Sequence, residues 1–425
     1  MIQRASQLVL AGLLLCSISA TSGNWPEWRG PNGDGTTSET GLPLQWSATK
    51  NVAWKTALPG DGNSTPVVWG DRIFLAQASS RDKTERLLMC FARADGRRLW
   101  ERRIEHKGED VTHKTNPHCA SSPATDGERV IVWFGSAGLH CYDMKGNPLW
   151  KRDLGTQAHI WGYGASPKIH GDLVYLNFGP GERSFLVAMD KRTGKTVWKN
   201  DEPGGSFGNR PKGQSGRDVW VGSWSTPIVR KVNGREEMLM SWPRRVVGMD
   251  PKTGKEFWEC TGLNPLVYTS PVYADGIVVA MGGYSGMALA VRAGGQGDVT
   301  ESHRLWHHPK TQQRIGSSAI YRDHIYILND PGTAECIELK SGKVVWKERL
   351  KGPGPTSRNW ASMVLSDGKL YVNNWSGDTI ILNASPKFEV LQINSIGEKT
   401  IGSIAVSNGD LFIRGYRHLW CISEN

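Results

Sequence analysis

Residues 188–198 read AMDKRTGKTVW, and residues 248–258 read GMDPKTGKEFW. Both run from a small residue and a hydrophobe through a polar turn containing Gly-Lys to a closing Trp, a pattern we call the Trp motif. Further copies close at Trp100, Trp150, Trp346 and, in degenerate form, Trp306. The motif recurs about every 48 residues, and a fixed period of this length predicts a repeat array instead of a mosaic of unrelated domains.

Each repeat also has a front half, in which a Ser or Thr, often followed by Pro, opens a short apolar strand. One example is Ser166-Pro167, followed by the apolar run 173–176. Asp-Gly pairs such as Asp275-Gly276 suit hairpin turns, because glycine adopts positive φ without steric cost. Each repeat supplies about four strands, and sustained helical periodicity is absent from the sequence. We predict an all-β β-propeller whose repeats are four-stranded antiparallel blades.

The number of blades follows from the positions equivalent to the closing Trp. They are Trp54, Trp100, Trp150, Trp198, Trp258, Trp306, Trp346 and Leu391. Residues 402–421 begin a last blade without an outer strand, whereas residues 51–55 are an outer strand with no blade before it. Pairing these two segments closes a ring of eight blades and removes free sheet edges. We predict eight blades closed by the N-terminal strand, with seven as the alternative.

The Trp motif resembles the tryptophan-docking repeat of the PQQ-like (quinoprotein alcohol dehydrogenase-like) family of eight-bladed β-propellers. The resemblance covers residues 46–421, and residues 25–35 (WPEWRGPNGDG) resemble the opening of uncharacterised secreted members. The family includes pyrroloquinoline-quinone (PQQ) alcohol dehydrogenases and BamB-like proteins, the propeller lipoproteins of the outer-membrane barrel-assembly machinery. The resemblance therefore implies the fold but leaves both enzymes and scaffolds open.

The resemblance to dehydrogenases implies cofactor features that can be sought in the chain. Such enzymes commonly have adjacent cysteines that form a disulfide beside the quinone, and some have a Cys-x-x-Cys-His haem motif. Neither pattern occurs among the seven cysteines, and calcium ligands cannot be matched residue by residue. We therefore expect no cofactor, with PQQ and calcium as the alternative.

The N-terminus indicates export. Residues 1–20 contain Arg4, an apolar run at 8–15 and small residues at the end, which is the pattern of a signal peptide and is too short for a membrane anchor. Lipid attachment at Cys16 is disfavoured because Leu15 occupies a position that requires a small residue. We predict a signal peptide at 1–20, an N-terminal segment at 21–45 and the propeller at 46–425, in the periplasm or outside the cell, with no transmembrane segment.

Neither the cysteines nor the charged residues form a pattern that indicates a site. Cys90, Cys141, Cys336 and Cys421 occupy the small-residue position of the Trp motif, so we expect buried free thiols instead of disulfides. The net charge of +10 is spread over the turns. Nucleic-acid binding would require a concentrated basic face, so we expect no nucleic acid. We expect a monomer.

Binding residues of a propeller are expected on the loops that converge on its axis. Counting back four residues from the Ser or Thr that opens each inner strand gives, among others, Asp61, His118, Arg314, Arg358 and Lys399. Aromatic residues precede the same step by two or three positions, namely Tyr163, Trp224, Tyr268 and Trp360. These residues predict a basic, aromatic channel mouth for an anionic or carbohydrate ligand. The alternative is a solvated rim with aromatic residues packed between blades.

Two insertions interrupt the repeats. Residues 101–118 contain His106, His113 and His118, but no Cys or paired carboxylate completes a ligand set, so we expect no metal. Residues 200–222 are rich in Gly, Arg and Lys without the ending of a phosphate-binding loop, and predict a surface loop able to act as a lid.

The sequence favours an exported propeller that binds or scaffolds an envelope protein or an anionic or carbohydrate ligand, with no recognisable catalytic residue. The first alternative is a PQQ-dependent alcohol or sugar dehydrogenase. The second is a polysaccharide lyase or hydrolase that uses histidines of the channel.

Overall fold

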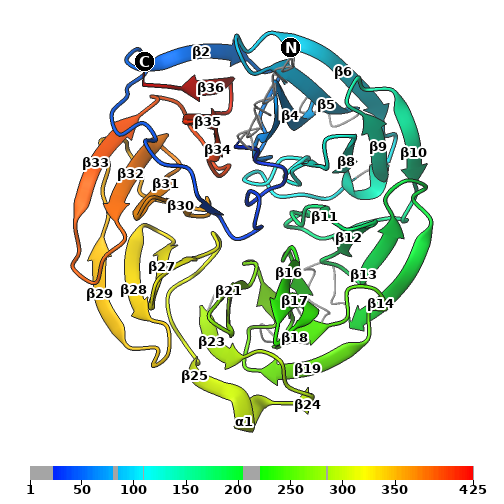
Figure 1. Cartoon of the computed structure of the whole chain (residues 1–425). Helices are drawn as coiled ribbons and strands as arrows, with labels where there is room; N and C mark the ends of the chain where they lie inside the picture. Colours follow the sequence, from blue (N-terminus) through cyan, green and yellow to red (C-terminus); the bar gives the residue numbers. More distant parts are fainter. Residues whose placement is uncertain (1–22, 80–84, 109, 204–220, 284–285, 425) are drawn as a thin grey trace, which may run out of the picture.

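The computed structural model describes residues 23–79, 85–108, 110–203, 221–283 and 286–424. Within these residues, eight antiparallel blades of four strands surround a common axis (Figure 1). Blades one to four are β3–β6 (Val67–Trp69, Arg72–Ala78, Glu85–Ala92, Arg98–Glu105), β7–β10 (Ala124–Thr125, Arg129–Trp133, Leu139–Asp143, Pro148–Arg152), β11–β14 (Lys168–His170, Leu173–Phe178, Arg183–Asp190, Thr196–Pro203) and β16–β19 (Ile228–Val232, Arg235–Trp242, Arg245–Met249, Glu256–Thr261).

Blades five to eight complete the ring. They are β21, β22, β23 and β25 (Val272–Ala274, Ile277–Gly282, Met287–Arg292, Arg304–His308), β26–β29 (Ala319–Tyr321, His324–Asn329, Thr333–Glu338, Val344–Arg349), β30–β33 (Val364–Ser366, Lys369–Asn373, Asp378–Asn383, Val390–Ser395), and β34–β36 with β2 (Ala405–Ser407, Asp410–Arg414, His418–Ile422, Val52–Ala57). The predicted all-β, eight-bladed fold is confirmed.

Short elements lie outside these blades. Two strands add in parallel to blades seven and four, namely β1 (Thr36–Thr37) and β24 (Gly297–Asp298). Strands β15 (Gly222–Ser223) and β20 (Leu266–Val267) pair with each other, and the helical turns are η1 (Gly135–Ala137) and α1 (Thr300–His303).

The N-terminal strand closes the ring, as predicted. Strand β2 pairs antiparallel with β36, the third strand of blade eight, with Trp54 opposite Cys421 (Figure 1). The same pairing occurs inside other blades, where Trp198 faces Ala188 and Trp346 faces Cys336. Strand β2 is therefore the outer strand of blade eight.

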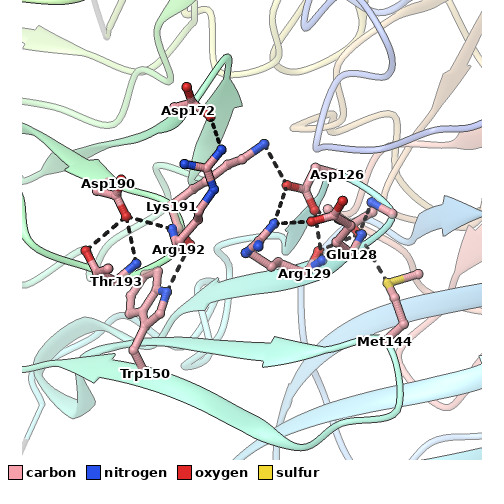
Figure 2. A network of polar contacts seen from close by, with 12 residues as sticks. Asp126, Glu128, Arg129, Met144, Trp150, Asp172, Asp190, Lys191, Arg192 and Thr193 are labelled. Carbon is pink, nitrogen blue, oxygen red and sulfur yellow. Dashed lines mark hydrogen bonds and ion pairs between the residues drawn. The ribbon is translucent and has the colours of Figure 1, made fainter.

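The Trp motif joins each blade to the next. Figure 2 shows Trp150 of blade two donating its indole N–H to the Lys191 carbonyl in the turn of blade three, at 3.0 Å. Gly194 of that turn has φ +69° and lies flat against Trp150, where a Cβ would come within 2.7 Å of the indole. Asp190 orders the turn by accepting the Thr193 N–H at 2.8 Å. The aspartate, the glycine and the tryptophan thus form one inter-blade contact.

This contact recurs around the rim. The indole N–H donates to a turn carbonyl of the next blade at Trp54, Trp100, Trp150, Trp198, Trp306 and Trp346, at 2.8–3.1 Å. Trp258 differs, because the chain between β23 and β25 of blade five contains β24 and α1 where the other blades have the turn. The Trp258 indole N–H donates instead to Glu237 of its own blade at 2.8 Å. The rim tryptophans are therefore structural, as predicted.

The cysteines behave as buried free thiols. Among the described residues, the free and buried cysteines are Cys90, Cys119, Cys141, Cys260, Cys336 and Cys421. Cys90 and Cys141 face Trp100 and Trp150 across their strand pairs, in the position that Ala188 fills in blade three. Their thiols fill the space beside the indoles, which explains the small residue in the Trp motif.

A closed ring of hydrogen bonds surrounds the axis. In every blade, the backbone N–H of one Ser or Thr donates to the side-chain oxygen of the equivalent residue in the next blade, at 2.9–3.2 Å. We call this the hydroxyl ring, and its members are Thr65, Ser122, Ser166, Thr226, Ser270, Ser317, Ser362 and Ser403. The residue that opens each inner strand therefore also connects its blade to the next.

The described part of the N-terminal segment, residues 23–45, runs across the centre of one face of the ring (Figure 1). Trp25 forms an antiparallel bridge with Val68 of blade one. Buried Glu27 forms an ion pair with Lys168 of blade three, and Arg29 donates to the Ser318 carbonyl of blade six at 2.6 Å. The segment therefore ties together blades that are not neighbours.

Candidate functional site

An axial cavity of about 170 Å³ lies beside the hydroxyl ring. Its wall contains the residue two positions before the ring hydroxyl in every blade. These residues, from blade one to blade eight, are Asn63, Ala120, Gly164, Trp224, Tyr268, Ile315, Trp360 and Ile401. Side chains in extended backbone alternate in direction, so this position points to the axis whenever the hydroxyl residue does.

The wall is asymmetric. Blades four, five and seven contribute the rings of Trp224, Tyr268 and Trp360, whereas blades one to three contribute Asn63 and two smaller residues. The lining also contains side chains that the sequence did not predict, namely Trp28 from the N-terminal segment, Asn116 and Trp161. No periodic signal marks these three residues, because each lies outside the regular repeat.

Two buried polar atoms of the wall have no hydrogen-bond partner among the residues that the structure describes. They are the indole Nε1 of Trp360, which can only donate, and Oδ1 of Asn63, which can only accept. An unpaired buried polar group costs about 1–3 kcal/mol. A ligand that offers both an acceptor and a donor would remove both costs.

The predicted aromatic residues divide into two groups. Trp224, Tyr268 and Trp360 line the cavity, and the rings of Trp224 and Tyr268 meet edge to face at 4.9 Å. Tyr163 is buried, its ring is tilted against that of Trp133 with 4.7 Å between the centroids, and its hydroxyl accepts the Cys119 N–H. His118 is also buried, with 4% of its surface exposed, so the structure gives no support to a catalytic histidine of the channel at this position.

The prediction that Arg314 faces the channel mouth is wrong. Its side chain is fully buried, and its guanidinium forms an ion pair at 2.8 Å with Glu335 and a hydrogen bond at 3.0 Å with Asn329. The register was displaced by one residue, because the hydroxyl of blade six belongs to Ser317 and not to Ser318. Gln313 is the true equivalent, and it lines the cavity.

The other two predicted cations stand at the edge of the cavity over one indole. The Arg358 guanidinium lies 4.6 Å and the Lys399 ammonium 5.1 Å from the ring centroid of Trp375, which in turn meets Trp360 edge to face at 4.9 Å. Lys399 also lies 4.4 Å from the ring of Tyr416. We call Arg358, Trp375, Lys399 and Tyr416 the mouth arc.

Carboxylates flank the mouth arc on both sides. Asp330 of blade six pairs with Arg358 at 3.1 Å, although 46% of the Arg358 side chain stays exposed. Burial lowers the pKa of Lys399, while the negative charge of Asp61 in blade one acts in the opposite direction. Asp61 therefore lies near Lys399, and both cations keep exposed surface.

A buried histidine supports the aromatic wall. His159 has no exposed surface and its ring meets Trp224 edge to face at 5.1 Å. Its Nδ1 accepts the Trp161 N–H at 3.2 Å, which places the proton of the neutral ring on Nε2. Burial lowers the pKa of His159 to about 4, so the ring is neutral at pH 7.

The histidines of the first insertion lie apart from one another. In residues 101–118, His106 lies 3.3 Å from Asp110, which pairs with Arg86, and His113 packs on Trp161. Groups of three or more possible metal ligands are absent from the described residues. Most of the predicted lid at 200–222, and the predicted signal peptide with Cys16, lie outside those residues.

The cavity can be tested against PQQ, a planar tricarboxylate that dehydrogenases bind with calcium. The aromatic walls suit a flat ring, but the described residues of the lining include no carboxylate for calcium. Arg358 and Lys399, which could pair with quinone carboxylates, lie outside the lining over Trp375. Calcium prefers six to eight oxygen ligands, usually with carboxylates among them. The lining therefore does not fit a calcium–quinone pair.

Relatives include both enzymes and an assembly factor. Polyvinylalcohol dehydrogenase from Pseudomonas sp is 23% identical over 237 residues, covering 49% of this chain and 35% of that protein, so the chain spans about a third of the length of this curated relative. BamB from Moraxella catarrhalis has a TM-score of 0.59 at 16% identity, covering 89% of this chain and 97% of that one.

Solved dehydrogenases are similar to the same extent. A europium-containing methanol dehydrogenase has a TM-score of 0.66 at 12% identity, covering 93% of this chain and 90% of that one. The quinohemoprotein alcohol dehydrogenase from Comamonas testosteroni has a TM-score of 0.64 at 11% identity, with coverage of 96% and 82%. At these identities the likeness shows the fold alone.

Across the described residues, no helix has the length and apolar character needed to cross a bilayer.

The family assignment rests on the sequence. The sequence model of the PQQ-repeat family described as "Outer membrane protein assembly factor BamB" matches residues 36–214, 83–348 and 182–425. The chain belongs to this PQQ-repeat family of β-propellers.

Proposed function

We propose that the protein is an exported binding propeller of the cell envelope that takes a carbohydrate in its axial cavity and carries out no redox chemistry there. The observation that carries this proposal is the cavity wall, which combines the aromatic rings of blades four, five and seven with amide and hydroxyl groups. It contains a donor and an acceptor that are unpaired among the described residues. Sugar rings present apolar faces to aromatic side chains, and each sugar hydroxyl both donates and accepts.

Export and an envelope location are part of the proposal. They are supported by the signal-peptide pattern of residues 1–20 and by the description of the family as an outer-membrane assembly factor. A monomer is expected because the propeller leaves only the short outer edge of each blade unpaired. Binding of an envelope protein by the outer faces of the ring remains compatible with a sugar in the cavity.

The alternative of a quinone-dependent dehydrogenase draws support from the relatives, but the oxygen donors of the lining do not suit calcium. It is tested by mixing the purified protein with PQQ and calcium chloride, removing the excess, and recording the absorption spectrum and dye-linked alcohol oxidation. We expect neither a retained chromophore nor oxidation, and either one would overturn the proposal.

The carbohydrate itself is tested by calorimetry and tryptophan fluorescence with cellohexaose, chitohexaose, hexagalacturonate and the methyl ester of hexagalacturonate. We expect at least one hexasaccharide to bind, and Trp224→Ala or Trp360→Ala to abolish binding. The matched control is Trp150→Phe, a rim tryptophan far from the cavity. The absence of binding by all four sugars to the folded protein would refute the carbohydrate proposal.

A further inference from the structure

The mouth arc repeats one backbone arrangement in consecutive blades. The Trp375 N–H donates to the Arg358 carbonyl at 2.8 Å in blade seven, and the Tyr416 N–H donates to the Lys399 carbonyl at 2.9 Å in blade eight. Each cation therefore stands above an aromatic ring of its own blade, and Lys399 also reaches Trp375 of the neighbouring blade. In blade six, the equivalent backbone contact joins Asp330 to Gln313 at 2.9 Å, so the two cations belong to blades seven and eight.

Hydrogen-bond donors are in excess at this place. In the described part of the chain, Nε1 of Trp360, Nε1 of Trp375 and the hydroxyl of Tyr416 are buried without a hydrogen-bond partner. The indole groups can only donate. Burial and the charge of Asp61 raise the pKa of Tyr416, which keeps its hydroxyl protonated and able to donate.

The charges of Arg358 and Lys399 also favour an anionic ligand. Two like charges over one indole repel each other, and the nearby carboxylates act on one cation each, Asp330 on Arg358 and Asp61 on Lys399. Both cations keep exposed surface. A group placed there would need acceptor oxygens and negative charge to satisfy both the unpaired donors and the cations.

We propose that the mouth arc binds the carboxylate of an acidic sugar, a uronate, in a chain whose neighbouring ring occupies the axial cavity. This inference rests on the proposed function, because the cavity must hold one sugar ring for the mouth arc to bind the carboxylate of the next ring in the chain. Trp360 connects the two places, since it lines the cavity and contacts Trp375 edge to face.

The test compares hexagalacturonate with its methyl ester, which has the same rings without the charge. We expect the acid to bind at least about tenfold more tightly, as charge-assisted hydrogen bonds allow. Raising the salt concentration should weaken binding of the acid and leave the ester unchanged. Equal affinity of acid and ester would overturn the inference while leaving the carbohydrate proposal standing. Binding of neither would also overturn the inference, and it would contradict the carbohydrate proposal only if cellohexaose and chitohexaose fail to bind as well.

Variants assign the effect to the arc. Arg358→Gln/Lys399→Gln should reduce the affinity for the acid to that for the ester. The control Lys195→Ala/Lys255→Ala removes the same charge from exposed rim turns and should preserve the difference. Hexaglutamate tests for a general anion site, and binding as tight as that of hexagalacturonate would overturn the assignment to a sugar. If the double variant melts early, the acid and ester titrations of the parent protein still decide the question.

Discussion

The tryptophans of the rim and those of the axial mouth differ in what their indole N–H groups do. At the rim, Trp198 donates to the Pro251 carbonyl of the next blade at 3.0 Å. At the mouth, Nε1 of Trp360 and of Trp375 is buried with no partner among the described residues. The rim indoles are paired, mostly with the next blade. Buried indole N–H groups without a partner among the described residues also occur in the core, at Trp25, Trp46, Trp242 and Trp420. What distinguishes the mouth is that its unpaired donors lie beside partly exposed cations, where a ligand could accept them.

The largest effect is expected from loss of the closing strand. A deletion through Lys55 removes the N-terminal segment and residues 52–55 of β2, which leaves most of β36 as an open edge. We expect aggregation or a large fall in the thermal midpoint, measured by light scattering and calorimetry. A deletion through Gln45 keeps β2 and serves as the control. If the longer deletion is monomeric and melts like the control, closure by β2 is not what stabilises the ring.

The rim and the mouth can be compared directly by one substitution in each. Trp198→Ala should lower the free energy of unfolding by about 3–5 kcal/mol, since it removes a packed indole and its hydrogen bond. Trp360→Ala should cost less, because it also removes a buried unpaired donor. Chemical denaturation gives both values. Equal losses would mean that Trp360 is ordinary packing.

Two arginines provide the next comparison. Arg314→Ala leaves Glu335 buried with Lys347 at 3.0 Å as its remaining ionic partner, so we expect a loss of about 3 kcal/mol. Arg358→Ala breaks a half-exposed pair and should cost about 1 kcal/mol or less. Only the second should weaken binding of hexagalacturonate. If Arg358→Ala lowers the free energy of unfolding as much as Arg314→Ala, the Arg358–Asp330 pair is a structural contact like the Arg314–Glu335 pair.

The smallest effect concerns pH. The pKa of His159 is about 4 in the folded protein against 6.5 for an ordinary histidine. The unfolded chain therefore takes up a proton first as the pH falls, and stability present above pH 6.5 is progressively lost toward pH 4. We expect a loss of up to about 2 kcal/mol between pH 7 and 5 in urea titrations. His159→Gln should flatten this slope, and an unchanged slope in that variant would contradict the assignment to His159.

The sequence predicted the repeated parts of the molecule well, because repetition averages out local ambiguity. The blade number, the closing strand and the rim tryptophans all follow from one motif. The mouth was predicted in part. Trp224, Tyr268 and Trp360 line the cavity, whereas Arg314 was misplaced because Ser317 and Ser318 are both able to open the inner strand.

The residues that were missed share a physical reason. Trp28 reaches the cavity from a segment that crosses the ring, and Asn116 and Trp161 come from loops of irregular length. Nothing in their local sequence shows that they meet at the axis. His159 was missed for the same reason, since its neutrality depends on burial by distant residues.

The hydroxyl ring has a consequence for how such proteins can be rearranged. All eight hydrogen bonds run in one sense, from each blade to its successor, and the bond from Ser403 to Thr65 is equivalent to the others. The hydrogen bonds around the axis are therefore the same between blades eight and one as between any other two neighbouring blades. Circular permutants that join the natural termini and open the chain between two other blades should retain the ring, as should arrays assembled from separately encoded halves. In such a permutant, blades eight and one would be joined within the chain. The new N-terminal strand would have to complete the blade formed by the new C-terminal strands, as β2 completes blade eight in the natural protein.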